Sequence, residues 1–234
     1  MVLDTLEILY QDDSIVAINK PNGLLVHRTR MAADEQEHFA VQMLRDQIGQ
    51  HMYPVHRLDR PTSGVLIMAL SSEMASLLKK QFDDRLIGKT YLAVCRGYCP
   101  PTGIIDEPLH NDRGVLQDAE TKYERLQTVE LPIQVSERYT TSRYSLVRVN
   151  PTTGRYHQIR KHFAKIRHYL IGDTKHGDLP HNRMFQEYLD CHGLLLHARS
   201  LTLTHPVSNQ SIRLTAGLPE HFKKITKTFR WNTL

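Results

Sequence analysis

The sequence predicts an α+β fold in which a mixed, largely antiparallel sheet is flanked by helices and loops. Short strand-like runs recur along the 234 residues, and apolar residues at helical spacing interrupt them in a few places. No repeat, low-complexity tract or evident linker divides the chain. Because 40% of the residues are hydrophobic, the chain can bury a full core, and we expect one domain over residues 1–234.

The opening segment predicts two short strands followed by a break. Apolar runs at residues 8–10 and 15–18 surround the polar, turn-like residues 11–14. The proline and glycine of residues 20–23 then interrupt the pattern. An extended run at 24–27 follows them.

A helix and a buried strand are predicted next. Apolar side chains at helical spacing predict a helix over residues 34–47, with Asp34 placed to cap it and Gly49 to end it. The continuous apolar run at 65–70 is typical of a strand that is buried on both faces. A second helix should follow over 73–82.

Strands and helices alternate through the rest of the chain. The polar region between residues 95 and 144 should form hairpins and loops, because it contains the sequence Cys99-Pro100-Pro101-Thr102-Gly103. The other expected elements are strands at 91–95, 144–149, 194–204 and 211–215, a helix over 155–165, and a short last helix that Pro219 opens.

Composition restricts the partner and the compartment. Lys and Arg outnumber Asp and Glu, 30 against 25, which gives a net charge of +5 and suits a polyanionic partner. No apolar run is long enough to span a bilayer and the first residues lack a signal-peptide pattern, so we expect a soluble, cytoplasmic protein. The cysteines Cys95, Cys99 and Cys191 lack the spacing of a zinc site or a disulfide framework and are expected to be free thiols.

Positive charge is concentrated in two segments. One is the segment from Arg155 to Arg167, and the other is the segment from Lys223 to Arg230. The ordinary interpretation of such a run is a solvated helical face, and we adopt it for the C-terminal segment. We do not adopt it for the first segment, because the neighbouring residues indicate a functional site, as described below.

The strongest chemical signal is His56-Arg57-Leu58-Asp59-Arg60-Pro61-Thr62-Ser63-Gly64. It places the carboxylate of Asp59 between two arginines, directly before the predicted buried strand. Pro61 restricts the preceding residue to extended conformations, and Gly64 permits backbone geometry closed to other residues, so we expect a rigid loop. Rigid loops at strand ends commonly carry functional sites. From the residues alone, a structural ion pair that fixes the loop is an equally good interpretation.

This segment closely resembles the signature of the RluA family of pseudouridine synthases, whose aspartate is the catalytic residue. The resemblance assigns that role to Asp59. Residues 89–94 are similar to the family motif that supplies an active-site tyrosine, here Tyr91. Residues 153–160 match the motif whose final arginine pairs with the catalytic aspartate, and that arginine is Arg160.

Three more segments agree with the family and extend the resemblance over nearly the whole chain. Residues 8–27 resemble its opening segment, and residues 171–173 match a third motif. Residues 195–198 resemble a segment whose leucine lines the uracil pocket, here Leu196. The resemblance therefore implies one pseudouridine-synthase catalytic domain over residues 1–234, without a separate N-terminal RNA-binding domain.

The implied reaction breaks the bond between ribose and N1 of uridine, turns the uracil, and bonds C5 to the same sugar carbon. Because composition does not change, no redox cofactor is needed, and neither a cofactor nor a metal is expected. Asp59 acts as the nucleophile or base while ionised, a state that a guanidinium such as that of Arg160 favours. Tyr91 is expected to stack on the uracil or to relay a proton. Without the resemblance, Tyr91 would be interpreted as a core aromatic and Arg160 as a solvent-facing helix residue.

The implied substrate is structured RNA, so the target base must leave its stem at a cost of roughly a few kcal/mol. The family uses the arginine two residues before its aspartate to fill the vacated space, which assigns this role to Arg57; simple phosphate contact is the alternative. Arg60, Arg155 and Lys161 are further expected substrate-binding residues. Stem recognition should depend on phosphates, 2′-hydroxyls and shape, because the major groove of A-form RNA is hard to read.

Transfer RNA is the first expected partner and ribosomal RNA the second. The short N-terminus and the pairs His27-Arg28 and Arg167-His168 resemble a family member whose target is the uridine at tRNA position 65. Tyr156 departs from the commoner family motif, which has threonine there. We expect a monomer with no obligate protein partner and no membrane association.

Two other classes of protein compete with this interpretation. One is a metal-dependent RNA hydrolase, built on neighbours that share metal-ligand chemistry: His157, His162, His168, His176 and Asp173. Their spacings form no recognised ligand set. The other is a non-catalytic RNA-binding or tRNA-folding protein, against which the joint presence of Asp59, Tyr91 and Arg160 argues.

Overall fold

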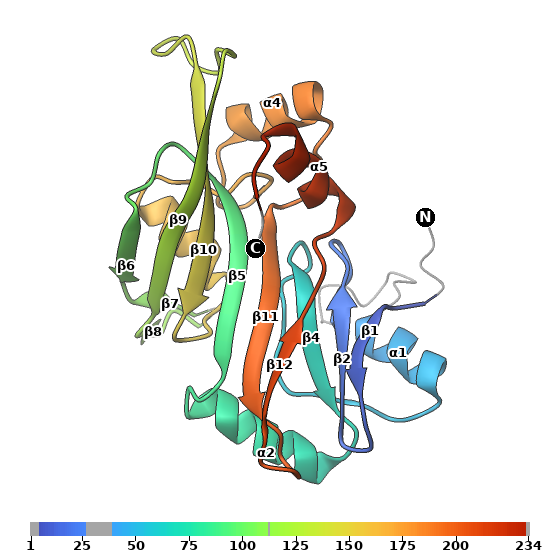
Figure 1. Cartoon of the computed structure of the whole chain (residues 1–234). Helices are drawn as coiled ribbons and strands as arrows, with labels where there is room; N and C mark the ends of the chain where they lie inside the picture. Colours follow the sequence, from blue (N-terminus) through green and yellow to red (C-terminus); the bar gives the residue numbers. More distant parts are fainter. Residues whose placement is uncertain (1–4, 27–38, 112, 233–234) are drawn as a thin grey trace. The chain divides into compact units, whose positions relative to one another are not determined.

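A computed structural model describes residues 5–26, 39–111 and 113–232. The chain forms two compact units. The first contains Met1–Lys89 and Ala198–Gly217, and the second contains Thr90–His197 and Leu218–Leu234. Figure 1 shows the elements of each unit along the chain. Each unit has a core of its own, and a single domain over residues 1–234 stays a prediction.

The first unit is built on strands in the order β1-β2-β4-β11, with β3 paired to β4 and β12 paired to β11. The pairings of β1 with β2, β2 with β4, β3 with β4, and β11 with β12 are all antiparallel. The first two residues of β11 belong to the second unit. The elements are β1 (Ile8–Gln11), β2 (Ile15–Lys20), α1 (Ala40–Ile48), β3 (Tyr53–Pro54), β4 (Ser63–Ala69), α2 (Ser72–Asp83), β11 (Leu196–Thr204) and β12 (Ser211–Thr215).

Strand β4 lies at the centre of this unit, and all seven of its residues are buried. The buried strand predicted at residues 65–70 is therefore confirmed. Helix α2, predicted over 73–82, follows directly and packs Ala75 and Leu78 into the same core. It begins at a side-chain cap, because Ser71 Oγ accepts a hydrogen bond from Met74 N–H at 3.2 Å.

Helix α1 confirms the end, but not the start, of the helix predicted over 34–47. It ends at Gly49, whose φ of 68° is left-handed and whose N–H donates to Arg45 O at 2.8 Å. Phe39 precedes its first residue and gives no side-chain cap. Asp34, the predicted cap, and His27 and Arg28 lie outside the described residues.

The second unit is built on strands in the order β5-β10-β9-β6, with a separate antiparallel pair β7-β8. The pairings of β5 with β10, β10 with β9, and β9 with β6 are antiparallel as well. Strand β5 begins with two residues of the first unit. The elements are β5 (Gly88–Arg96), β6 (Thr102–Asp106), β7 (Leu109–His110), β8 (Leu116–Gln117), β9 (Glu120–Leu131), β10 (Ser142–Pro151), α3 (Gln158–Lys165), α4 (Leu179–Leu189) and α5 (Glu220–Thr228).

The helices of the second unit cover its sheet with aromatic side chains. Phe185 of α4 and Phe222 of α5 belong to one buried cluster, and these two helices lie beside each other in Figure 1. Phe163 of α3 packs against Tyr123 of β9 with ring centroids 5.4 Å apart. The basic residues of α5 follow the predicted solvated face, since Lys223 pairs with Glu220 of the same helix.

The second unit also corrects one prediction and confirms another. Helix α3 begins at Gln158 rather than 155, because His157 has a left-handed φ of 55° that a helix cannot contain. The region between 95 and 144 does form hairpins, but it includes the twelve-residue strand β9. The fold is nevertheless α+β with largely antiparallel strands, as predicted. In the described part of the chain, no helix is long and apolar enough to cross a membrane.

Candidate active site

Asp59 lies in the loop of the first unit that joins β3 to β4. The loop alternates in exposure: Arg57 and Arg60 are exposed, Asp59 is half-buried and Leu58 is buried. Asp59 O accepts a hydrogen bond from Thr62 N–H at 3.0 Å, which closes a turn directly before β4. Leu58 therefore anchors the loop in the core while the charged side chains on either side reach the surface.

A buried lysine joins this loop to the turn that follows β2. Lys20 is fully buried, and its Nζ donates to the carbonyl oxygens of Pro21 at 2.9 Å, Leu24 at 2.8 Å and Arg60 at 3.2 Å. Burial lowers the pKa of Lys20 to about 7, whereas the negative charge of Asp59 raises it and the positive charge of Arg60 lowers it. Three carbonyl acceptors suit the three donors of an ammonium group, so we assign the protonated form to Lys20.

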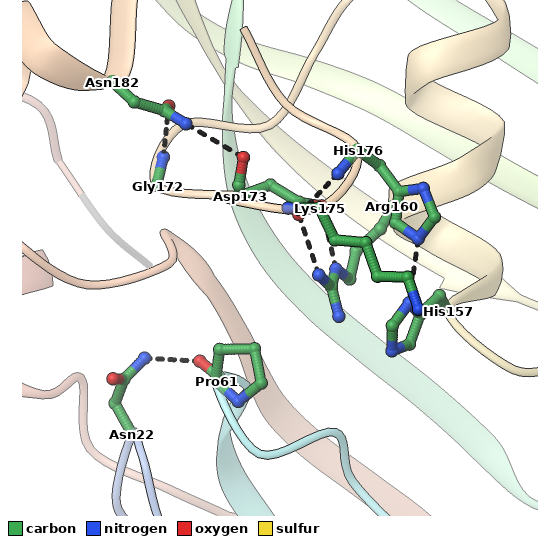
Figure 2. A network of polar contacts seen from close by, with 9 residues as sticks. All are labelled: Asn22, Pro61, His157, Arg160, Gly172, Asp173, Lys175, His176 and Asn182. Carbon is green, nitrogen blue, oxygen red and sulfur yellow. Dashed lines mark hydrogen bonds and ion pairs between the residues drawn. The ribbon is translucent and has the colours of Figure 1, made fainter. Parts of the chain in front are cut away.

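Further hydrogen bonds fix the same contact from both sides. Gly23 N–H donates to Arg60 O at 2.9 Å, and Arg60 Nε donates back to Gly23 O at 3.0 Å. Figure 2 shows the amide of Asn22 donating to Pro61 O. These contacts support the prediction of a rigid Asp59 loop. The residues at 20–23, interpreted from the sequence as a break and as part of the family's opening segment, hold this loop in place.

His56 explains why the chain leaves the sheet before Asp59. Strand β3 pairs with β4 only at Tyr53 and Pro54. Two residues later, Nε2 of His56 accepts the N–H of Ile67 at 3.0 Å, so a side chain satisfies a strand donor in place of a backbone carbonyl. The ring stacks on Phe82 with centroids 4.8 Å apart, and burial, followed by the charge of Lys89, lowers the pKa of His56 to about 3. His56 is therefore neutral and serves as an acceptor.

Gly64 is required where the loop enters β4. Its φ is 113°, and a Cβ at this position would lie 2.2 Å from Ala198 O. No other residue fits without moving a backbone. The role predicted for this glycine is confirmed.

In the second unit, Arg160 is held by a buried carboxylate. Arg160 lies on α3 with 4% of its side chain exposed, and Asp173 has 1% exposed. The guanidinium donates through Nε to Oδ2 of Asp173 at 2.8 Å and through Nη2 to Oδ1 at 2.7 Å, as Figure 2 shows. Such two-point contact fixes both position and plane of the arginine. The interpretation of Arg160 as solvent-facing is wrong.

Asp173 receives backbone donors as well. Its Oδ1 accepts the N–H of Lys175 at 2.9 Å and of His176 at 3.0 Å. Burial alone raises the pKa of Asp173, but the hydrogen bonds and charge of Arg160 and these backbone donors outweigh it, so the pKa lies below its usual value. Asp173 is therefore ionised opposite Arg160.

Asn182 of α4 holds the loop that carries Asp173. Its side-chain amide donates to Asp173 O at 2.9 Å and accepts Gly172 N–H at 2.8 Å, as Figure 2 shows. Sequence reasoning matched residues 171–173 to the family but gave them no task, and it missed Asn182. The available signal was Asp178, which caps α4 through His181 N–H and places Asn182 one turn into the helix.

A pair of histidines extends this network toward Tyr156. His157 Nδ1 and His176 Nε2 are 2.8 Å apart, so one ring donates and the other accepts. Burial, followed by the charge of Arg160, lowers the pKa of His157 to about 3, which keeps this ring neutral. The ring of Tyr156 stacks on that of His157, with centroids 3.8 Å apart and planes at 23°.

The second unit brings two of the other predicted residues together. Tyr91 of β5 is half-buried and packs against a core cluster that contains Leu196 and Phe163. Arg155 and Lys161 reach neighbouring loops. Arg155 Nε donates to the backbone carbonyl of residue 118 at 3.0 Å, and Lys161 Nζ donates to the carbonyl of residue 110 at 3.2 Å.

Two of the histidines proposed as metal ligands, His162 and His168, have partners outside the proposed set. His162 lies between Thr121 Oγ1 and Glu107 O, each 2.9 Å away, and His168 Nδ1 lies 2.8 Å from Arg96 O. Within residues 5–26, 39–111 and 113–232, no group of three or more His, Cys, Asp or Glu side chains could hold a metal ion. The three cysteines are free and buried, as predicted.

The antiparallel α+β fold, the rigid Asp59 loop and the buried arginine of α3 define the class of the protein. The family model for RNA pseudouridylate synthases matches residues 14–165, more than half of the chain, and this range contains Asp59, Tyr91 and Arg160. The chain belongs to the RNA pseudouridylate synthase family.

Known relatives support this assignment along the whole chain. The tRNA pseudouridine synthase C of Haemophilus influenzae is 46% identical over 240 residues, which covers 98% of this chain and 100% of the relative. The protein of the same name from Yersinia pestis is 48% identical and covers 97% and 92%. Among solved structures, human RNA pseudouridylate synthase domain containing 4 has a TM-score of 0.73 at 25% identity and covers 97% of this chain and 94% of its own.

Proposed function

We propose that this chain isomerises uridine to pseudouridine in tRNA, with Asp59 as the catalytic nucleophile. The observation that carries the proposal is the position of Asp59: a half-buried carboxylate on a loop held by Lys20 and two glycines. The relatives named tRNA pseudouridine synthase C support tRNA as the substrate because their similarity extends over at least 97% of this chain.

The proposed reaction conserves every atom of the nucleotide. The bond from N1 to C1′ breaks, the bond from C5 to C1′ forms, the proton on C5 is released to solvent and N1 gains one. Attack at C1′, addition to the uracil ring and removal of the 2′ proton each begin from the ionised carboxylate of Asp59. None of these paths needs a cofactor or a metal ion.

The remaining site residues have complementary roles in this proposal. Arg160, held in place by Asp173, supplies a fixed positive charge that favours ionised groups and developing negative charge. Tyr91 stacks on the uracil or relays a proton, and Leu196 lines the uracil pocket with an apolar side chain. Each role combines the family resemblance with the burial and contacts described above.

Four basic side chains, of which Arg57 and Arg60 are exposed, are proposed to hold the RNA. Arg57 fills the space that the flipped uridine leaves, and Arg60, Arg155 and Lys161 contact the phosphate backbone. We further propose that the target is the uridine at tRNA position 65 and that the protein acts as a single-domain cytoplasmic monomer.

Mass-spectrometric mapping of pseudouridine in treated RNA tests the proposal. Transfer RNA and ribosomal RNA would each be incubated with the wild-type protein and with Asp59→Asn. The expected result is new pseudouridine at tRNA position 65 with the wild type alone. Product in ribosomal RNA would overturn the substrate, and no product in either RNA would overturn the function.

A further inference from the structure

Two lysine side chains of the second unit place their ammonium groups near the ring of Tyr156. This residue lies in the turn before α3 and is half-buried. Lys161 Nζ, from α3, is 5.3 Å from the ring centroid, and Lys175 Nζ, from the loop before α4, is 5.5 Å from it. Both distances lie within the range of cation–π attraction. Two segments of the chain therefore bring ammonium groups to one aromatic ring.

The ring is held in place by buried groups beneath it. Tyr156 stacks on His157, which is 9% exposed. His157 is fixed in turn by its hydrogen bond to His176, whose backbone N–H donates to Asp173. Figure 2 shows His157, His176 and Lys175 at this end of the network. A ring supported in this way loses little conformational freedom when it binds a ligand.

The two ammonium groups lack the ion pairs that other lysines of this unit form. Lys165 pairs with Glu107 at 2.9 Å, and Lys224 pairs with Asp190 at 2.6 Å. Within the described part of the chain, neither Lys161 nor Lys175 forms an ion pair with a carboxylate. The carboxylate nearest in sequence to Lys175 is Asp173, which is engaged by Arg160 and by backbone N–H groups. Positive charge therefore accumulates around an aromatic ring without a compensating anion.

An aromatic ring flanked by two cations has the chemistry of a nucleotide site. A base or ribose can pack on the ring, and the adjoining phosphate can pair with the ammonium groups. We propose that Tyr156, Lys161 and Lys175 bind a nucleotide of the RNA substrate other than the target uridine. This inference rests on the proposed function, because that function supplies RNA as the ligand. Under this inference, Tyr156 contributes to the selection of the RNA substrate.

The test measures equilibrium binding of a tRNA transcript at several salt concentrations. Tyr156→Leu keeps apolar bulk over His157 but removes the aromatic face, and it should weaken binding roughly 5- to 100-fold. Tyr156→Phe keeps the face and should bind within about twofold of the wild type. Lys175→Gln should reduce the slope of log affinity against log salt by about 0.7 to 0.9. Lys223→Gln, whose lysine pairs with Glu220, is the matched control and should leave the slope unchanged.

Two results would overturn the inference. One is a Tyr156→Leu protein that binds tRNA as tightly as the wild type. The other is a Lys175→Gln protein with an unaltered salt slope, and this variant changes an exposed side chain that the core does not need. In steady-state assays, KM should rise with the dissociation constant in both variants. A wild-type protein that forms no pseudouridine would instead overturn the proposed function, because binding is measured independently of turnover.

Discussion

Asp173→Asn is the substitution that probes the second unit most sharply. Asparagine keeps the size of the side chain and an oxygen that can accept the backbone donors of Lys175 and His176. It removes the negative charge opposite Arg160 and turns an amide donor toward a guanidinium donor. Because only 4% of the arginine and 1% of the aspartate side chain is exposed, water cannot replace the lost partner.

Breaking a buried ion pair by removing one member costs about 3–5 kcal/mol, against a total stability of roughly 5–15 kcal/mol. We therefore expect Asp173→Asn to lower the free energy of unfolding by about 3–5 kcal/mol, measured by urea denaturation at pH 7. Glu220→Gln removes a carboxylate that is 88% exposed and pairs with Lys223, and this control should leave stability unchanged within error. A loss below about 1 kcal/mol for Asp173→Asn would refute the assignment of a buried, ionised pair.

The double variant Arg160→Met with Asp173→Leu distinguishes a catalytic role of Arg160 from a purely structural one. Replacing a buried pair by apolar residues of similar size is often neutral for stability. We expect the double variant to unfold at a urea concentration closer to the wild type than Asp173→Asn does, yet to form no pseudouridine. Activity in the double variant would show that Arg160 is a structural residue only.

Three further predictions concern Lys20, Gly64 and the dependence of stability on pH. Lys20→Met removes the donor from three carbonyl oxygens and should lower the single-turnover rate of isomerisation at least tenfold. Lys79→Met, at an exposed position, is the control, and an equal rate in both variants would show that the catalytic loop does not need Lys20. Gly64→Ala forces a Cβ to 2.2 Å from a backbone oxygen at a φ of 113°, so the melting temperature should fall by several degrees, whereas an unchanged value would contradict the close approach. Burial lowers the pKa of His56 and of His157 to about 3, so below pH 6.5 the unfolded chain binds protons that the folded chain does not. Stability should therefore fall from pH 6.5 toward pH 3, by at most about 1.4 kcal/mol per pH unit for each histidine, and urea midpoints that stay constant between pH 7 and pH 4 would count against neutral buried rings.

Local features made part of the fold predictable. Strand β4 begins with serine and glycine and continues as an uninterrupted apolar run that is buried on both faces, so its composition alone predicts it. Strand β9 escaped prediction because its charged residues alternate with only a few apolar ones. Helix α4 escaped because its apolar stripe includes His181 and Asn182, whose burial depends on partners elsewhere in the chain.

Some features of the site could likewise be predicted from the sequence, and others could not. The Asp59 loop could be found because its residues are contiguous, Pro61 restricts the backbone locally, and Gly64 permits a backbone geometry closed to other residues. The pairing of Arg160 with Asp173 could not, because Asp173 lies 13 residues away on a loop that Asn182 of α4 holds in place. The left-handed backbone of His157 was equally hidden, since non-glycine residues adopt that conformation rarely.

Release of tritium from C5 of uridine tests the central claim most directly, because each isomerisation removes one hydrogen from that carbon. A tRNA transcript labelled at C5 would be incubated with the wild type, with Asp59→Asn, and with Asp13→Asn as an exposed carboxylate control in the same unit. The account predicts release with the wild type and the control and none above background with Asp59→Asn. Release by Asp59→Asn at the wild-type rate would contradict Asp59 as the nucleophile, and no release by the wild type would contradict isomerisation of tRNA.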